Sequence, residues 1–355
     1  MRLLPCFLLA SALTAQTPAV SGSSSEGDFI TRDFRLDSGE RLAELRIHYT
    51  AFGRPVRGAD GKTTNAVLVL HGTGGSGRGF LSAGFAGELF GPGKLLDTAR
   101  YYVVLPDGIG HGKSSKPSDG MRARFPHYNY NDMVRAQRLL LTDGLGVSRL
   151  RLIIGTSMGC MHAWVWGTTF PEFTDGLVPL ACAPTAIVGR NRMIRTMVID
   201  DIRQDPEYAD GNYTAQPRGF RAANQLLYMM SSAPLVQHRV GATRAAADSV
   251  IRSYLDARVA NNDANDMLYA FDASRDYDPS AQLARVQVPV LAINSADDLV
   301  NPPELGLVER LTKGMPNVRF ILLPITEQTR GHGTHSVPAV WGGYLAEFMK
   351  SLPAR

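Results

Sequence analysis

The sequence predicts an α/β protein with a mostly parallel β-sheet covered by helices on both faces. Three observations support this prediction. Short β-type runs alternate with helical patterns along most of the 355 residues, the central β-type runs are continuously apolar, and one long helical segment interrupts the alternation after residue 185. Continuous apolar runs are typical of parallel strands buried on both faces of a sheet.

The β-type runs come in two kinds. FITRDFRL (29–36) and ELRIHYTAFG (44–53) alternate apolar and polar residues and predict an antiparallel opening pair. The apolar runs predict central strands at 66–71, 101–106, 151–157, 176–182, 288–295 and 318–324. Helices are expected at 130–143, 158–169, 303–313 and 338–350.

The segment 185–280 contains no convincing strand, and its apolar residues recur at helical spacing. We expect it to form a helical cap inserted between two late strands, over the edge of the sheet where ligands bind. Because the insertion interrupts one sheet, residues 28–355 are predicted to form a single domain that includes the cap.

The first residues predict export. Met1 and Arg2 precede LLPCFLLASALTA, an apolar run that ends in small residues, and this is the layout of a secretory signal peptide over 1–15. Residues 16–27 are polar and predict a flexible leader. We therefore expect a periplasmic or secreted protein without a membrane span in the mature chain.

Two cysteines, Cys160 and Cys182, remain after such processing. Both lie in apolar surroundings that are typical of buried free thiols, and we expect them to be unpaired. A disulfide between them stays open as the alternative, because an exported protein meets an oxidising compartment.

Composition excludes several classes of protein. The chain is 44% hydrophobic and 20% charged, so it is neither disordered nor collagen-like. The net charge is only +4, and no stretch concentrates the basic residues, so no nucleic-acid partner is expected. The glycine-rich run HGTGGSG (71–77) lacks the P-loop pattern, and the eight histidines show no metal-ligand spacing, so we expect neither cofactor nor metal.

The sharpest local motif is GTSMG at 155–159, which fits G-x-S-x-G. It follows an apolar strand and precedes a helix, the context in which this motif exposes a nucleophilic serine on a sharp turn. Ser157 is therefore the predicted nucleophile.

A serine hydroxyl needs a base and a residue that orients the base, in the chain order Ser, acid, His. Asp297 and Asp298 follow the run VLAIN, and Asp297 is favoured because D-x-L-V-N-P resembles the turn that usually follows the acid. His332 in GHGTH is the predicted base, with His335 as the alternative. The backbone N–H groups of Thr73 and Met158 are the predicted oxyanion donors. We expect DGIGHGKSS (107–115) to be a structural turn.

These residues resemble the α/β-hydrolase superfamily, and more narrowly its homoserine O-acetyltransferase-like branch. The narrower resemblance covers about 66–348 and rests on GPGKLLDTARYYVV, FPHYNYNDMVRAQRLLL, GTSMGCMHAW, DIRQDPEYADGNY, SADDLV and GHGTH, in this order. It implies the α/β-hydrolase fold, a mostly parallel eight-stranded sheet with a helical cap between late strands. It also implies a triad of Ser157, Asp297 and His332, often in a homodimer.

Three departures separate the chain from acetyltransferases of that branch. DGIGHGKSS replaces their N-x-x-G-G-x-x-G-S-T loop, GTSMGC replaces GGSMGG, and Ile199 occupies the position of an arginine that helps hold the amino-acid substrate. Arg195, one helical turn earlier, is the alternative partner for a substrate carboxylate, but we do not favour it. Acetyl-CoA is a cytoplasmic metabolite, whereas water is available to an exported enzyme.

The sequence therefore favours an exported serine hydrolase that cleaves a small-molecule carboxylic ester through an acyl-enzyme. An acyltransferase that moves an acyl group to a small alcohol is the first alternative. A binding protein without catalysis on the same fold is the second, and it would require the three triad side chains to lie far apart.

Overall fold

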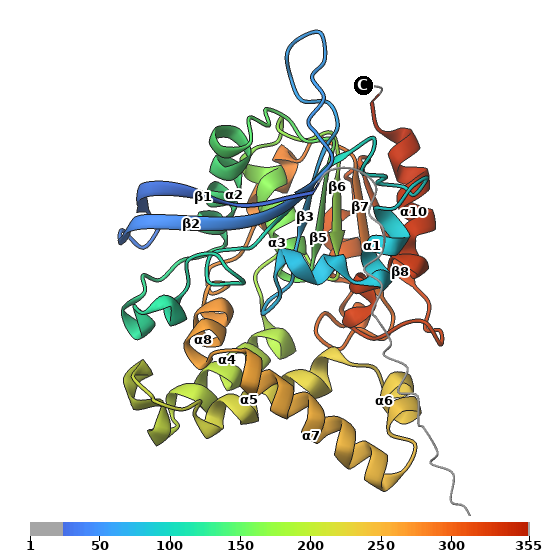
Figure 1. Cartoon of the computed structure of the whole chain (residues 1–355). Coiled ribbons are helices and arrows are strands. Elements are labelled where there is room, and N and C mark those ends of the chain that lie inside the picture. Colours follow the sequence, from blue (N-terminus) through green and yellow to red (C-terminus); the bar gives the residue numbers. More distant parts are fainter. Residues whose placement is uncertain (1–23, 354–355) are drawn as a thin grey trace, which may run out of the picture.

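The computed structural model describes residues 24–353 and contains an eight-stranded sheet in the order β1-β2-β4-β3-β5-β6-β7-β8 (Figure 1). The strands are β1 Ser24–Arg35, β2 Arg41–Phe52, β3 Ala66–Leu70, β4 Tyr102–Pro106, β5 Leu152–Thr156, β6 Leu177–Leu180, β7 Val290–Ser295 and β8 Val318–Leu323. All eight coincide with predicted runs, so the predicted fold class is confirmed.

Strand direction follows the two kinds of sequence pattern. β1 pairs antiparallel with β2, and β2 pairs antiparallel with β4. Along the order β4-β3-β5-β6-β7-β8, each strand is parallel to the next. Leu68 at the centre of β3 pairs with Val104 on one side and with Ile153 on the other, and all three are fully buried.

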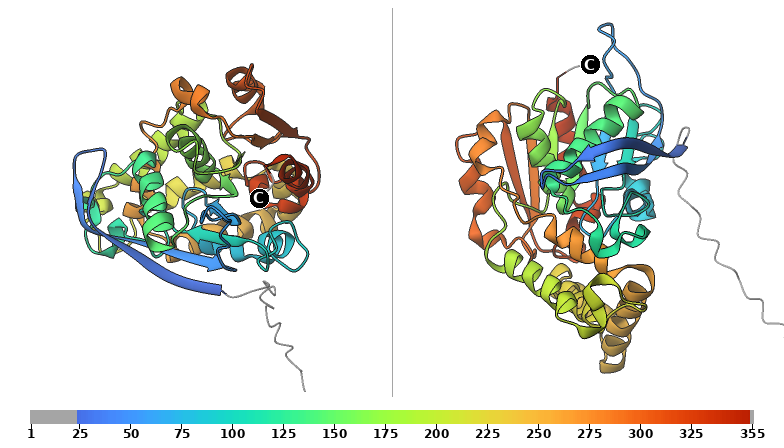
Figure 2. Two further views of the ribbon diagram at one scale, coloured as in Figure 1. Left: turned by 90° about the horizontal axis from the view of Figure 1, so that it is seen from above. Right: turned by 90° about the vertical axis from the view of Figure 1, so that its left-hand side faces the viewer.

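Alternate side chains of the central strands pack into two separate cores, as the period-two geometry of a strand requires. Val67 belongs to the core that contains helices α1 (Ala83–Leu89) and α10 (Pro338–Ser351). Leu68 belongs to the core that contains α2 (Tyr130–Leu139) and α3 (Met158–Thr169). The sheet is therefore covered on both faces (Figure 2).

The predicted cap is a group of helices between β6 and β7, and Figure 1 shows it at one end of the sheet. It comprises α4 Gly189–Arg203, α5 Arg218–Ser231, α6 Pro234–Val240, α7 Arg244–Asn261 and α8 Ala264–Asp272. Outside it, α9 spans Leu307–Thr312. Short helical turns lie at Gly77–Leu81, Pro117–Asp119, Arg122–Arg124, Leu140–Gly144, Pro206–Gly211, Ser280–Arg285, Pro303–Leu305 and Gly333–Ser336.

Two boundaries differ from the predictions. Residues 24–27, expected in the flexible leader, belong to β1, where Gly27 pairs with Tyr49 and the Glu26 carboxylate lies 2.9 Å from His48 Nε2. The helix expected at 303–313 is split by Gly306, whose φ is +56°. The predicted signal peptide, 1–15, and leader residues 16–23 lie outside the described residues.

No helix within residues 24–353 is both long and apolar enough to cross a bilayer. The same part of the chain holds no group of three or more histidine, cysteine or acidic side chains arranged to hold a metal ion.

Candidate active site

Ser157 occupies a sharp turn between β5 and α3. Its φ of +53° and ψ of −108° place a non-glycine residue in a backbone region that is rarely populated. Strain of this kind persists only where the surroundings impose it, and it clusters at functional sites. The Ser157 N–H donates to Leu180 O, 2.9 Å away, so the neighbouring strand β6 holds the turn in place.

The two glycines of the motif make this turn sterically possible. A Cβ on Gly155 would lie 1.9 Å from Gly159 O, and a Cβ on Gly159 would lie 2.2 Å from Leu70 O. The backbone of α3 therefore approaches β3 and β5 too closely for any side chain at either position. The motif is required by the packing of helix on sheet.

His332 lies in the loop between β8 and α10, where its ring bridges two other functional groups. Its Nε2 lies 2.7 Å from Ser157 Oγ, and its Nδ1 lies 2.9 Å from Asp298 Oδ2 and 3.1 Å from Oδ1. The structure thus brings the predicted serine and histidine into hydrogen-bond contact across 175 positions of sequence.

The prediction that Asp297 orients His332 is wrong. In the turn after β7, Asp298 points at His332, whereas Asp297 Oδ2 accepts a hydrogen bond from Gly331 N–H at 3.0 Å. Asp297 also contacts the hydroxyl of Ser295. Adjacent residues of a turn point in different directions, so only one of the two carboxylates reaches the imidazole, and the other braces the histidine loop.

Asp298 is buried and held by several donors. Burial alone would raise its pKa, but the charge and hydrogen bond of His332, together with the N–H groups of Val300 and Asn301, hold the pKa of Asp298 below its ordinary value. The carboxylate is therefore ionised at neutral pH. The alternative base, His335, packs edge-on against His332, and its Nδ1 lies 2.8 Å from Ser336 Oγ.

The predicted oxyanion loop lies beside the nucleophile. A Cβ on Gly72 would lie 3.1 Å from Ser157 Cβ, so the backbone that carries Thr73 passes next to the serine. Met158 is the first residue of α3, where N–H groups have no partner inside the helix. Both predicted donors are thus close to Ser157, and their catalytic role stays a prediction.

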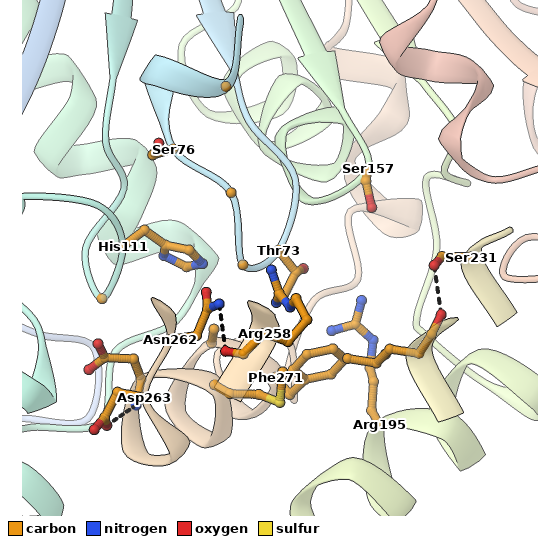
Figure 3. A pocket seen from close by; sticks show the side chains of 18 of the residues that line it. Thr73, Ser76, His111, Ser157, Arg195, Ser231, Arg258, Asn262, Asp263 and Phe271 are labelled. Carbon is orange, nitrogen blue, oxygen red and sulfur yellow. Dashed lines mark hydrogen bonds between the residues drawn. The ribbon is translucent and has the colours of Figure 1, made fainter. Parts of the chain in front are cut away.

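A cavity of about 560 Å³ separates the sheet edge from the cap. Ser157 and Thr73 line its sheet side, and Arg195 and Phe271 line its cap side (Figure 3). His332 also lines the cavity. The volume is typical of a site for a small molecule. The polar groups therefore meet in a space that a small substrate would fill.

Arg195 is the most unusual group on the cap side, because it is a buried cation whose partners within residues 24–353 are all neutral. Its Nε donates to Asn191 Oδ1 at 3.0 Å and its Nη1 to Ser274 Oγ at 2.9 Å, while the guanidinium lies over the Phe271 ring. By contrast, Ile199 is buried in the core and does not line the cavity.

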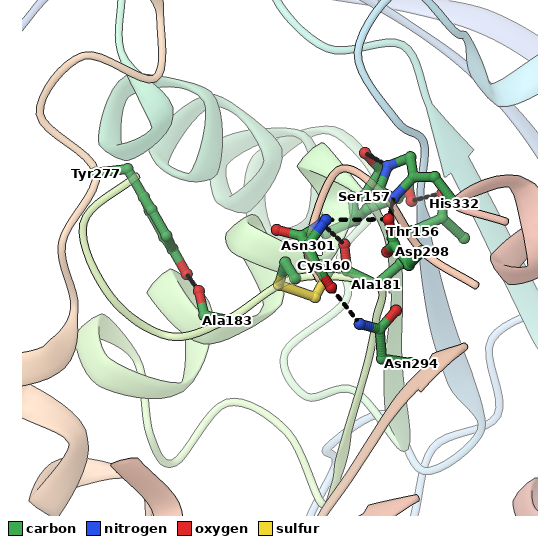
Figure 4. Close-up of a disulfide and its surroundings, with 12 residues drawn as sticks. Thr156, Ser157, Cys160, Ala181, Ala183, Tyr277, Asn294, Asp298, Asn301 and His332 are labelled. Atoms are coloured by element: carbon green, nitrogen blue, oxygen red, sulfur yellow. Dashed lines mark hydrogen bonds and ion pairs between the residues drawn. A yellow bond between two sulfur atoms is a disulfide. The ribbon is translucent and has the colours of Figure 1, made fainter. Parts of the chain in front are cut away.

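The expectation of two free thiols is wrong, because Cys160 and Cys182 form a disulfide (Figure 4). Cys160 is three residues after Ser157 on α3, and Cys182 follows β6. The bond joins the first turn of the nucleophile helix to the neighbouring strand. The end of β6 is also tied to the acid, because Asn301 Nδ2 donates to Ala181 O at 2.9 Å and Asn301 N–H donates to Asp298.

The segment 107–115 is only partly the structural turn that was expected. Asp107 has that role, since it accepts hydrogen bonds from the N–H groups of Gly77 and Lys113. His111, however, lines the cavity, which the sequence did not predict. Arg195, considered from the sequence but not favoured as a substrate-binding residue, lines the cavity too. The G-H-G pattern around His111 was the available signal, since glycines let a backbone approach a site closely.

A family model described as alpha/beta hydrolase fold matches residues 65–327. A homoserine O-acetyltransferase from Pelobacter propionicus is 30% identical over 315 residues, which cover 77% of this chain and 82% of that protein. A probable acyltransferase from Methanothermobacter thermautotrophicus is 27% identical over 83% of this chain and 89% of its own. With a homoserine O-acetyltransferase from Geotalea daltonii identity rises to 37%, but the alignment spans 52% of this chain and 53% of that protein.

Two solved structures share the fold equally well. The crystal structure of an esterase has a TM-score of 0.79 at 21% identity, covering 92% of this chain and 100% of its own. The homoserine O-acetyltransferase from Bacillus anthracis also has a TM-score of 0.79 at 21% identity, covering 93% and 99%. An esterase and a transferase are thus equally similar in backbone, so the fold does not distinguish hydrolysis from transfer.

Proposed function

The chain belongs to the α/β-hydrolase family, in its homoserine O-acetyltransferase-like branch, and on that premise we propose that it is an exported serine hydrolase that cleaves small-molecule carboxylic esters. The observation that carries this proposal is the hydrogen-bonded line from Ser157 Oγ through His332 to Asp298 at the wall of the cavity. Nucleophile, base and orienting acid stand in the order and contact that acyl transfer requires.

In the proposed reaction, Ser157 Oγ attacks the ester carbonyl while His332 Nε2 takes the hydroxyl proton. The N–H groups of Thr73 and Met158 stabilise the oxyanion. The alcohol leaves with the proton from His332, and water then attacks the acyl-enzyme with His332 again as base. Asp298 holds the imidazole so that Nε2 faces the serine, and it stabilises the imidazolium that forms in each half-reaction.

Two observations support export and hydrolysis over transfer. The Cys160–Cys182 disulfide fits an oxidising compartment, as does the N-terminal apolar run. An exported enzyme meets water but not acetyl-CoA. Which acceptor resolves an acyl-enzyme depends on whether a site positions an alcohol and excludes solvent.

The test is covalent labelling of the mature protein with a fluorophosphonate, followed by hydrolysis of p-nitrophenyl esters of increasing chain length. We expect label on Ser157 and, in Ser157→Ala, no label and a loss of turnover on the order of 10⁵-fold or more. Full turnover in Ser157→Ala, with the fold intact by circular dichroism, would refute the proposal.

The second candidate is an acyltransferase, favoured by the names of the relatives and by the buried Arg195 in the cavity. An uncompensated guanidinium is suited to a carboxylate on the acyl acceptor. Acetyl-CoA and homoserine supplied together distinguish the two: release of CoA that depends on homoserine supports transfer. Ester hydrolysis that no alcohol accelerates supports the hydrolase.

A homodimer is a further part of the proposal. Three exposed apolar side chains, Val188, Met193 and Met197, lie at the start and along the outer face of α4 with exposed fractions of 63%, 61% and 51%. Apolar residues gathered on one surface often mark an interface between proteins. Light scattering should give twice the mass of the chain, and Met193→Glu with Met197→Glu should give the single mass.

A further inference from the structure

We propose that His111 and Thr73 form a subsite for a hydroxyl group of the substrate, so that the preferred esters carry a free hydroxyl on the acyl or the alcohol part. This inference rests on the proposed ester hydrolysis and adds a substrate class to it. Its basis is a pair of buried polar atoms, His111 Nε2 and Thr73 Oγ1, that have no hydrogen-bond partner among the described residues.

Both residues line the cavity that also contains Ser157. Figure 3 shows them on the side of the cavity formed by the loops of the sheet. The side chain of His111 is only 4% exposed. Buried polar atoms in proteins are almost always hydrogen-bonded, and leaving one unpaired is costly. No residue within 24–353 supplies a partner to either atom, and because both residues line the cavity, a bound ligand can supply one.

A hydrogen bond and burial determine whether His111 Nε2 donates or accepts a hydrogen bond. His111 Nδ1 lies 2.9 Å from Ile109 O, a carbonyl that only accepts, so Nδ1 carries the hydrogen. Burial, reinforced by nearby His71, lowers the pKa of His111 to about 3, so the ring is neutral at neutral pH. Its Nε2 therefore presents a lone pair and requires a hydrogen-bond donor.

His71 does not compete for that lone pair. Its Nδ1 lies 2.9 Å from Gly72 O and its Nε2 accepts from Gly108 N–H at 2.9 Å, so both of its ring nitrogens are occupied. The same two contacts clamp the Thr73 loop against the loop of His111. The subsite is thus held by backbone groups on both sides before any ligand binds.

A hydroxyl group fits this pair better than an ammonium group. A hydroxyl can donate to His111 Nε2 and can accept from Thr73 Oγ1–H, so it offers both kinds of hydrogen bond that the two atoms lack. The cavity wall carries the cations Lys116, Arg195 and Arg258. Its two carboxylates are already engaged, Asp263 by Tyr213 and Gln216, and Asp266 by Ser118 and Lys116. An ammonium would therefore face excess positive charge, whereas a neutral hydroxyl would not.

The experiment measures kcat/KM for matched pairs of esters with the full-length mature enzyme. Butyl acetate against 4-hydroxybutyl acetate tests the alcohol part, and p-nitrophenyl butyrate against p-nitrophenyl 3-hydroxybutyrate tests the acyl part. We expect the wild type to prefer the hydroxyl ester in one of the two pairs by roughly tenfold or more. His111→Phe and Thr73→Val should each bring that ratio close to one, and Thr73→Ser, which keeps the hydroxyl, should restore it.

His162→Gln is the matched control. His162 is also buried, its Nε2 also lacks a partner within residues 24–353, and it lies outside the cavity. The kcat/KM ratio of the hydroxyl ester to the plain ester should be the same in His162→Gln as in the wild type. A wild-type ratio near one in both pairs, or a ratio that survives both His111→Phe and Thr73→Val, overturns the inference.

Failure of the proposed function has a different signature. It appears as no Ser157-dependent cleavage of the plain esters, and the subsite inference then falls with it. Because Thr73→Val keeps the backbone N–H and nearly the volume of threonine, it decides the matter even if His111→Phe does not fold.

Discussion

The two walls of the cavity differ in how their polar groups are paired. On the sheet side, hydrogen bonds connect Ser157 to His332 and His332 to Asp298. On the cap side, the buried cation of Arg195 has only neutral partners in the part of the chain that the structure describes. A group that is fully paired inside the protein is held ready for chemistry, whereas a group with unused capacity is available to a ligand. We therefore expect the sheet side to carry the proposed reaction, and the cap and the loops of Thr73 and His111 to select the substrate.

The largest expected effect tests the sheet side. Asp298→Asn should lower kcat by roughly 10³- to 10⁴-fold, because the imidazole loses the carboxylate that orients it and stabilises its charge. Asp297→Asn is the control, and a loss of about tenfold or less is expected since an amide oxygen still accepts from Gly331. Steady-state ester hydrolysis measures both. If Asp297→Asn lowers kcat more than Asp298→Asn does, Asp297 is the orienting acid, as the sequence predicted.

Removal of the disulfide tests whether the sheet side of the cavity depends on the Cys160–Cys182 bond for its stability. Cys160→Ser together with Cys182→Ser should lower the free energy of unfolding by about 3 kcal/mol, because the bond closes a loop across 22 positions. Urea unfolding of the double variant against the oxidised wild type measures the effect. An unchanged midpoint with full activity would show that the nucleophile turn stands without the bond.

Removal of the positive charge of Arg195 tests whether the cap side of the cavity selects substrates by charge. Arg195→Met should lower the preference for mono-p-nitrophenyl succinate over p-nitrophenyl butyrate by roughly 10- to 100-fold, since it removes the buried cation that faces the cavity. Arg192→Met, on the exposed face of the same helix, is the matched control. If both variants show the same preference, the cap does not select by charge.

The smallest expected effect concerns pH. Burial lowers the pKa of His71 and His162, and lowers that of His111 to about 3. Below about pH 6.5 the unfolded chain binds protons that the folded chain does not, so stability present at higher pH is lost as pH falls. Each histidine contributes up to about 1.4 kcal/mol per pH unit.

Urea unfolding at pH 8, 6 and 5 measures this slope. His162→Gln should reduce it, and the exposed His238→Gln should leave it as in the wild type. Equal slopes in all three proteins would mean that the buried histidines take up protons without unfolding.

Local sequence patterns predicted most of the fold and two residues of the candidate site, Ser157 and His332. Continuous apolar runs located the parallel strands β3 to β8, because a strand buried on both faces is apolar at most positions. Alternating runs located β1 and β2. GTSMG located Ser157, because the close approach of α3 to β5 and β3 excludes side chains at Gly155 and Gly159. The G-H pair located His332. These features depend on residues close together in sequence, and such residues can be recognised without knowing the fold.

Tertiary structure decided what depends on distant segments. Asp297 and Asp298 are neighbours in sequence, and only the path of a loop 34 positions away determines which one meets His332. Likewise, the pairing of Cys160 with Cys182 depends on α3 lying beside β6. The cavity lining of His111 and Arg195 arises where the cap folds over the sheet. The sequence by itself determined the α/β class and the predicted nucleophile and base. The carboxylate that meets His332, the disulfide and the cavity groups of the cap required three-dimensional contacts between segments that no local pattern brings together.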